Sequence, residues 1–259
     1  MVSIKSLLLS GLLATSSLAA PVEQKNNEPR LFGGHDKRGL AFNDESIFTG
    51  FLGKLAFGWS YNWAATGPSS GPEFVPMLWG TKMFGEWPGA IEQSLASGAK
   101  NILGFNEPDL AAQANMSPQE AADAWKIHMN PYAGRAKLGS PGVTSDQSGG
   151  EKGLGWLRSF FDACGGQCTV DFLAIHWYGP ASNVENFKNH VREAVELARS
   201  QGINDVWVTE FRGEGEGELK FVAEVLPWLD NEPGVARYAY FMVDEIANTE
   251  VGQAYSESG

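Results

Sequence analysis

Two glutamates stand at the ends of two short apolar runs, about a hundred residues apart in the chain. Glu107 lies within Gly104–Asp109, and Glu210 lies near the end of Val206–Phe211. Pro108 favours an extended conformation for Glu107 and removes the next backbone donor, so we expect a strand to stop there with Glu107 at its lip. A single Glu is more often a surface carboxylate. Two carboxylates at two strand ends of one barrel, however, are what acid/base glycoside hydrolysis requires.

Further polar and aromatic side chains at run ends could support this chemistry. His176 and Tyr178 are two residues apart, so in a strand they point the same way and could donate hydrogen bonds to Glu210. A satisfied core histidine is an equally good interpretation of His176. Trp63 and Trp79 could stack on sugar rings, although core or rim packing is the alternative for each of them.

Two asparagines and an aspartate each allow more than one interpretation. Asn43 and Asn62 end apolar runs and could bind hydroxyl groups, but as loop residues they could equally form turns. Asp109 fits a cap of the following helix better than a catalytic group.

The elements that must position these residues alternate along the chain. Eight apolar or aromatic runs alternate with mostly helical segments, which predicts an α/β fold with a single (β/α)8 TIM barrel and active-site groups at the C-terminal strand ends. A doubly wound open sheet is disfavoured because no Gly-x-Gly-x-x-Gly turn follows the first run. Few residues follow the eighth run, so the C-terminal end of the barrel should be shortened. The runs are 39–43, 56–63, 73–80, 100–106, 136–143, 171–179, 206–211 and 235–242, and the expected helices include 86–96, 118–129, 153–163, 184–200 and 218–229.

The N-terminal region precedes the expected barrel. Residues 1–19 combine Lys5, an apolar core and small residues, which predicts a secretory signal peptide. Residues 20–38 are polar and lack periodicity, which predicts a disordered pro-segment or linker. This segment ends in Lys37-Arg38, a pair that resembles a dibasic processing site or is a chance pair. The catalytic domain is expected at 39–259, and the protein is expected to be secreted to the extracellular space or cell wall.

Composition limits the partners. The formal net charge of −12 disfavours nucleic acid and anionic membranes and fits a neutral substrate, and we expect a monomer. Cys164 and Cys168 are the two cysteines, and in an exported chain a disulfide is the better interpretation, because a metal site would lack two ligands. We expect no cofactor and no metal. Asn115 begins a glycosylation sequon, although Pro118 directly after it disfavours occupancy.

Six separated motifs carry a resemblance to a known family. An Asn-Glu-Pro on the fourth strand with a Glu on the seventh is similar to the large retaining (β/α)8 clan of glycoside hydrolases. The wider set resembles the fungal alkali-sensitive-linkage type of glycosyl hydrolase, glycoside hydrolase family 128. The motifs are Gly39–Asn43, Tyr61–Trp63, Phe74–Gly80, Gly104–Asp109, His176–Tyr178 and Thr209–Phe211.

This resemblance implies endo-β-1,3-glucan cleavage, with Glu107 as acid/base and Glu210 as nucleophile. It also implies that Asn106 holds the sugar 2-hydroxyl, and it adds Trp177 to the candidate substrate-binding residues. The chain departs from the family pattern at Arg212, where members usually have Gly, and in the acidic residues 214–218. The end of the chain also looks shortened, and both loops should border the cleft.

Three functions remain in competition from the sequence. The leading hypothesis is a secreted, retaining endo-β-1,3-glucanase that acts on cell-wall glucan. The second is a weakly active glucan-binding cell-wall protein, and the third is a hydrolase of the same clan that acts on another neutral polysaccharide.

Overall fold

The computed structural model describes residues 37–51, 57–146 and 151–257, which all belong to one compact unit of the chain. The expected signal peptide and nearly all of the expected pro-segment lie outside the described residues. None of the helices in the described ranges is long and apolar enough to cross a membrane.

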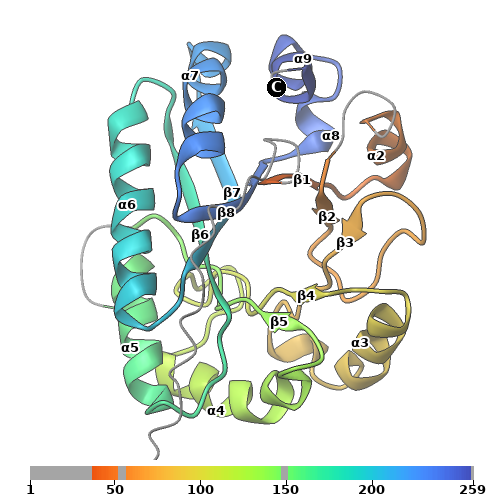
Figure 1. Cartoon of the computed structure of the whole chain (residues 1–259), viewed down its shortest axis with the longest axis vertical. Helices are drawn as coiled ribbons and strands as arrows, with labels where there is room; N and C mark the ends of the chain where they lie inside the picture. Colours follow the sequence, from red (N-terminus) through yellow and green to blue (C-terminus); the bar gives the residue numbers. More distant parts are fainter. Residues whose placement is uncertain (1–36, 52–56, 147–150, 258–259) are drawn as a thin grey trace, which may run out of the picture. The chain divides into compact units, whose positions relative to one another are not determined.

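Strands and helices follow one another in the order that the sequence predicts, except that in the described part of the chain no helix lies between the second and third strands (Figure 1). The eight strands are arranged in a ring, and the longer helices lie outside this ring. The strands are β1 Arg38–Ala41, β2 Trp59–Tyr61, β3 Glu73–Phe74, β4 Asn101–Ile102, β5 Lys137–Leu138, β6 Phe172–Pro180, β7 Asp205–Glu214 and β8 Val235–Tyr240. The helices are α2 Glu45–Phe51, α3 Trp87–Ala96, α4 Pro118–His128, α5 Gly153–Cys164, α6 Val184–Ser200, α7 Glu218–Asn231, α8 Val243–Ile246 and α9 Glu250–Glu257, with short 3-10 helices η1 Thr81–Met83 and η2 Asn130–Tyr132.

The strand pairings close the predicted parallel barrel. One sheet has the order β3-β2-β1-β8-β7-β6, and β4 pairs with β5 in a second sheet. Parallel bridges join the two sheets on both sides, Met77 to Leu103 after β3 and Gly139 to Phe172 between β5 and β6. The predicted (β/α)8 fold is therefore confirmed. Helix α4 lies between β4 and β5. The shortened C-terminal end consists of two short helices, α8 with four residues and α9 with eight.

Aromatic side chains fill the inside of the ring. Near the start of their strands, Trp207 stacks on Phe172 with centroids 3.9 Å apart and packs at a tilt against Trp59 at 5.0 Å. A larger apolar layer lies between the strands and the outer helices. These two layers fix the strands and leave their C-terminal ends as the place where polar side chains can gather.

The pair Lys37-Arg38 belongs to the barrel. Arg38 is the first residue of β1, and both side chains are buried. The ammonium group of Lys37 donates to the carbonyls of Leu229 and Glu232 at the end of α7, each at 3.1 Å. Arg38 donates to the carbonyl of Tyr255 in α9 at 2.7 Å. The barrel therefore begins before Gly39, and the peptide bond after Arg38 lies inside a paired strand.

Candidate active site

Glu107 lies immediately after the last bridge between the fourth and fifth strands. That bridge joins Asn106 to Gly142, and the N–H of Glu107 donates to the carbonyl of Gly142 at 2.7 Å. The backbone of Glu107 has a φ of 42°, so the expectation of an extended conformation is wrong. The hydrogen bond to the next strand and the turn closed by the N–H of Leu110 hold it in this left-handed region. Such backbone strain is characteristic of functional sites.

Glu210 is delivered by an irregular part of β7. The register with β8 shifts between Val208 and Phe211, and the register with β6 shifts so that Glu210 pairs with His176. A bulge of this kind re-aims side chains near active sites. The Glu210 side chain is 6 % exposed, and each of its oxygens accepts a hydrogen bond. Trp63 donates its indole N–H to Oε1 at 2.7 Å, and Tyr178 donates its hydroxyl to Oε2 at 2.5 Å.

His176 connects the two carboxylates. Its Nδ1 lies 3.0 Å from Oε1 of Glu107 and 3.5 Å from Oε2 of Glu210. Burial alone would lower the pKa of His176, but the charges of Glu210 and Glu107 outweigh burial and raise it above its usual value. One oxygen of Glu107, Nδ1 of His176 and one oxygen of Glu210 all lie within 4.8 Å of one another. Among the described residues these three are the set that could ligate a metal ion together.

Two tyrosines next to Glu210 stay protonated. Burial, followed by the charge of Glu210, raises the pKa of Tyr178 far above its usual value. The same two causes raise the pKa of Tyr61, whose hydroxyl donates to the carbonyl of Thr209 at 2.7 Å. Both hydroxyl groups therefore remain donors over any working pH, and Tyr178 keeps its hydrogen bond to Glu210.

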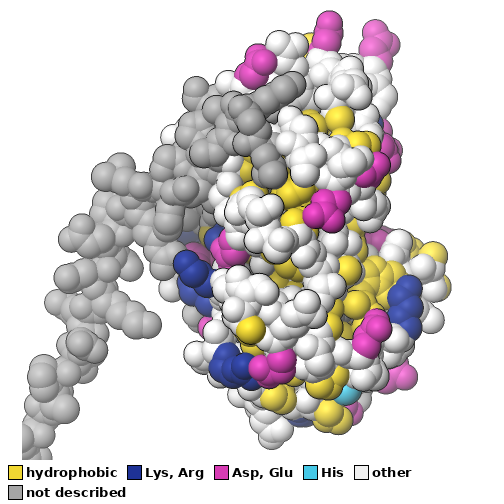
Figure 2. All heavy atoms as spheres, turned by 90° about the vertical axis from the view of Figure 1, so that its right-hand side faces the viewer, with side chains coloured by type: hydrophobic (Ala, Val, Ile, Leu, Met, Phe, Trp, Pro, Cys, Tyr) yellow, Lys and Arg dark blue, Asp and Glu magenta, His cyan; other side chains and the backbone are white. Residues whose placement is uncertain are grey.

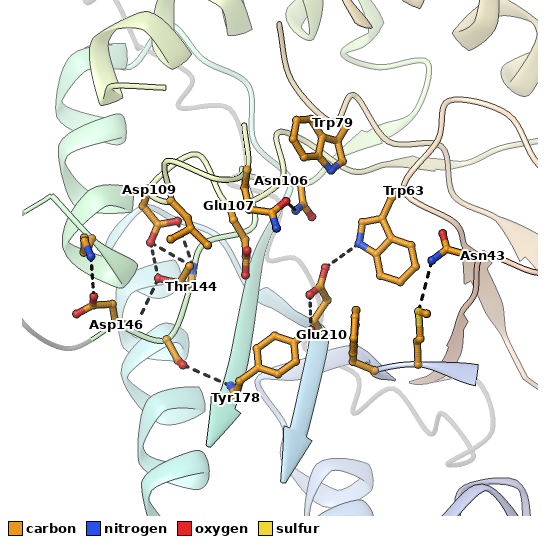
Figure 3. A pocket seen from close by; sticks show the side chains of 16 residues that line it. Asn43, Trp63, Trp79, Asn106, Glu107, Asp109, Thr144, Asp146, Tyr178 and Glu210 are labelled. Carbon is orange, nitrogen blue, oxygen red and sulfur yellow. Dashed lines mark hydrogen bonds and ion pairs between the residues drawn. The ribbon is translucent and has the colours of Figure 1, made fainter. Parts of the chain in front are cut away.

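A pocket of about 710 Å³ opens over these groups. Figure 3 shows Glu107 and Glu210 facing the same space, with the indole N–H of Trp63 directed at Glu210 and Trp79 across the cavity. Figure 2 shows hydrophobic side chains gathered in a hollow of the molecular surface, between parts that are mostly polar. The residues that line the pocket are Asn43, Trp63, Trp79, Asn106, Glu107, Asp109, Leu110, Gln113, Thr144, Ser145, Asp146, Lys152, Tyr178, Glu210, Phe241 and Met242.

Most of the residues expected from the sequence meet at this pocket. Asn43, Trp63, Trp79, Asn106, Glu107, Tyr178 and Glu210 line it, and His176 lies buried behind the carboxylates. One face of Trp79 is covered by Lys82, whose ammonium nitrogen lies 3.6 Å from the ring centroid. A sugar ring could therefore stack only on the other face of Trp79.

Two expected residues lie elsewhere. Asn62 accepts from the N–H of Ala64 at 3.1 Å and donates to the carbonyl of Thr66 at 3.2 Å, so it forms a turn. Trp177 points away from the pocket because side chains alternate along β6. It stacks on Phe221 and donates to Asn186 at 3.0 Å. These positions do not support substrate contacts for either residue.

Asp109 caps a helix, but a different one from the helix expected. Its carboxylate accepts from the N–H of Gly153, the first residue of α5, at 2.8 Å and from both donors of Thr144. The next helix in the chain, α4, is capped by Ser117 and Glu120 instead. Asp109 therefore ties the loop that follows Glu107 to the loop that follows β5.

The remaining predicted features lie outside the pocket. Cys164 and Cys168 form a disulfide at the end of α5. Asn115 is exposed and has a left-handed φ of 47°. Its glycosylation stays a prediction.

Sequence reasoning missed several lining residues. Phe241 and Met242 end the eighth run, so their position at a strand end was the signal that could have found them. Gln113, Thr144 and Lys152 lie in loops without a distinguishing pattern, and the barrel topology alone brings them to the pocket.

Known proteins are similar to this chain in fold and in sequence. The family model described as "Glycosyl hydrolase catalytic core" matches residues 39–258. Alkali-sensitive linkage protein 1 of Schizosaccharomyces pombe is 30 % identical over 220 residues, which is 79 % of this chain and 38 % of the relative. The chain thus spans well under half the length of that relative.

Two solved structures extend the comparison. A family 128, subgroup III curdlan-specific exo-β-1,3-glucanase from Blastomyces gilchristii, in complex with glucose, is 51 % identical with a TM-score of 0.82, and the match covers 86 % of this chain and 98 % of the other. A subgroup I endo-β-1,3-glucanase from Amycolatopsis mediterranei, in complex with laminaritriose, is 28 % identical with a TM-score of 0.71, and the match covers 86 % and 100 % of the two chains.

Proposed function

The chain belongs to the glycosyl hydrolase catalytic core family and, within it, to glycoside hydrolase family 128, and from this premise we propose that it cleaves β-1,3-glucan by a retaining double displacement. The protein is a glycoside hydrolase. The choice of substrate is supported by the related structures, which include exo- and endo-β-1,3-glucanases and complexes with glucose and laminaritriose.

The observation that carries the proposal is the close approach of two buried carboxylates in one pocket. An oxygen of Glu107 and an oxygen of Glu210 lie within 4.8 Å. In retaining glycosidases the two carboxyl groups are roughly 5 to 5.5 Å apart, whereas inverting enzymes leave roughly 6.5 to 9.5 Å for a water molecule. The 4.8 Å limit applies to one oxygen of each group, and it lies below the range of inverting enzymes, which favours direct attack by one carboxylate on the sugar.

Hydrogen bonding supports the roles that we propose for the two carboxylates. Both oxygens of Glu210 accept hydrogen bonds, from the indole of Trp63 and the hydroxyl of Tyr178, and these two bonds orient the carboxylate for attack. Glu107 accepts from His176 at Oε1, and within the described part of the chain its Oε2 has no hydrogen-bond partner. Oε2 of Glu107 is therefore the atom that can carry a proton to the substrate.

The reaction then proceeds in two steps. Glu107 gives its proton to the glycosidic oxygen while Glu210 attacks the anomeric carbon, so the glycosidic bond breaks and an ester to Glu210 forms. In the second step Glu107 takes a proton from water, the water oxygen attacks the same carbon, and Glu210 leaves. His176 contacts both side chains and fixes their relative positions.

The pocket suits a neutral polysaccharide. Trp79 offers an apolar ring face, and Asn43 and Asn106 offer hydrogen-bonding groups for hydroxyls. Asn106 precedes Glu107, so its carboxamide is well placed for the hydroxyl beside the reacting carbon.

We also propose that the protein is exported and acts on cell-wall glucan. The N-terminal pattern of residues 1–19 and the pairing of Cys164 with Cys168 support export. Expression with a C-terminal tag in a secreting host, followed by N-terminal sequencing of protein from the medium, tests this. Retention of residues 1–19 on cell-associated protein would contradict it.

A panel of polysaccharides tests the substrate directly. Reducing ends should appear on laminarin and curdlan and stay at background on cellulose, chitin and mannan, with Glu107→Gln as the inactive control. The length of the first products then separates release of single sugars from internal cleavage. Hydrolysis of another glucan or of mannan, with none on laminarin and curdlan, would reject β-1,3-glucan as the substrate.

A further inference from the structure

One ring packs against both of the aromatic donors that hold Glu210. Phe241 meets Trp63 edge-to-face with centroids 5.7 Å apart and a 71° interplanar angle. It meets Tyr178 in the same manner at 5.3 Å and 78°. Among the residues that the structure describes, Phe241 is the one ring that packs on both of these donors.

The donors need such support because their hydrogen bonds depend on orientation. Trp63 has a left-handed backbone with a φ of 57°, a conformation that persists only when neighbours enforce it. Its indole N–H must point at Oε1 of Glu210 while the hydroxyl of Tyr178 points at Oε2. A rotation of either ring would remove one donor from the carboxylate.

The segment that carries Phe241 is anchored on both sides. Arg212, two residues after Glu210 on β7, donates its Nε to Glu218 at 2.8 Å and its Nη1 to Glu245 of α8. The hydroxyl of Tyr240 also donates to Glu218, at 2.8 Å. The strand that bears Glu210 is thus tied to the residues on either side of Phe241.

The opposite side of this segment is tied to the first strand. Asp244 accepts from the N–H groups of Asn43 and Asp44 at 2.9 and 2.6 Å. The N–H of Phe241 itself donates to the carbonyl of Phe211 at 3.1 Å. Phe241 therefore occupies a fixed place between β7, α8 and the end of β1.

We propose that Phe241 is a positioning residue for the nucleophile, which orients both donors of Glu210, and that Arg212 acts through it by anchoring the segment that carries it. The catalytic consequence rests on the proposed function, since it concerns Glu210 as the nucleophile. The geometric part, that Phe241 and Arg212 hold the Trp63 N–H on Glu210, stands independently of any activity.

The geometric part is tested by solvent exchange of the Trp63 indole N–H in ¹⁵N-labelled protein, with the resonance assigned from Trp63→Phe. Phe241→Leu and Arg212→Gln should each speed this exchange by about tenfold or more, because the bond to Glu210 opens more often. Phe241→Tyr should keep the ring and the protection. Phe161→Leu on α5 and Arg135→Gln, whose bidentate partner is Glu92, are the matched controls and should leave exchange unchanged.

The catalytic part is tested on a β-1,3-glucan oligosaccharide. Phe241→Leu should lower kcat by up to about 100-fold, with a smaller change in KM. Its loss should overlap with that of Trp63→Phe, so that the double variant is little worse than the poorer single variant. Additive losses would mean that Phe241 acts separately on the substrate, and they would overturn the proposal.

The two failures are distinguishable. Unchanged indole exchange in Phe241→Leu or in Arg212→Gln overturns the positioning role of the residue concerned, whatever the activity. A wild-type protein that hydrolyses no glucan overturns the proposed function, while the exchange measurement still decides whether Phe241 and Arg212 hold Trp63 in place.

Discussion

The two ends of the barrel both bury ionisable side chains, but they balance the charge in different ways. At the N-terminal end, Lys37 and Arg38 extend to the last turns of α7 and α9, neither of which has a basic residue of its own there. Arg38 also lies 3.5 Å from Asp230. The helix carbonyls and the carboxylate of Asp230 compensate the buried positive charge.

The C-terminal end instead concentrates negative charge. Glu107 and Glu210 share one histidine, and Trp63 and Glu107 both have left-handed backbones. This fold therefore uses buried charge for two purposes. At one end charge is compensated and fastens α7 and α9 to the first strand, and at the other a surplus of carboxylate is kept for chemistry at a cost in stability.

The largest expected effect is on catalysis, at the C-terminal end of the barrel. Glu107→Gln and Glu210→Gln should each lower kcat by roughly 10²- to 10⁴-fold or more, because one amide cannot donate the proton and the other cannot form the glycosyl-enzyme. Neither should lose stability or glucan binding. Kinetics and calorimetry measure both, and azide should partly restore turnover in Glu210→Gly. Near wild-type turnover in either Gln variant would remove that residue from the mechanism.

At the N-terminal end of the barrel the expected effect is on stability alone. Arg38→Met should lower the free energy of unfolding by about 3 to 5 kcal/mol, because carbonyls and Asp230 lose a buried partner. Urea denaturation measures this loss, and kcat of the folded fraction should stay unchanged. Arg135→Met, which breaks an exposed pair with Glu92, is the control and should cost less than about 1 kcal/mol. Equal stability of the two variants would contradict the stabilising role of Arg38 at the N-terminal end of the barrel.

Two buried histidines should give opposite pH dependences of stability. The carboxylates raise the pKa of His176, so its contribution is complete below about pH 6.5 and is lost as pH rises through the raised value. Burial lowers the pKa of His190 to about 4, so stability falls as pH drops from about 6.5 towards 4. Urea denaturation from pH 4 to 9 should show that His176→Gln loses the alkaline slope and His190→Gln the acid slope. The same slopes in both variants would refute the assignment.

The smallest effect is expected away from both ends. The disulfide joins residues only four apart, so its loss in the double Ser variant of Cys164 and Cys168 should cost at most about 2 kcal/mol and leave kcat unchanged. Denaturation and kinetics of the variant measure both. Mass spectrometry that found two free thiols in unreduced secreted protein would refute the bond itself.

The sequence was sufficient for the barrel because its signals are local. Alternating apolar runs and helical segments predicted the strand order, and run ends predicted that Glu107 and Glu210 would meet. Helices such as α6 match the expected bounds, since their amphipathic periodicity is strong. The strands at β3, β4 and β5 are shorter than the runs, since isolated bridges replace continuous pairing there.

The features that the sequence did not predict depend on contacts between residues that are distant in the chain. The left-handed conformation of Glu107 is imposed by the carbonyl of Gly142, which overrides the local preference set by Pro108. Lys37 and Arg38 resembled a linker pair because their partners lie near residues 229 to 255. The capping of α5 by Asp109 was not predicted for the same reason, since nothing near Asp109 in the chain identifies Gly153 as its partner.

The stereochemistry of the first product tests the central claim most directly. If Glu210 attacks the sugar itself, a β-linked glucan should release the β-anomer first, and proton NMR of an early reaction on a laminari-oligosaccharide should show this signal before mutarotation. Release of the α-anomer first would mean that water attacks from the far side. Glu210 would then be a general base, and the retaining mechanism would be contradicted.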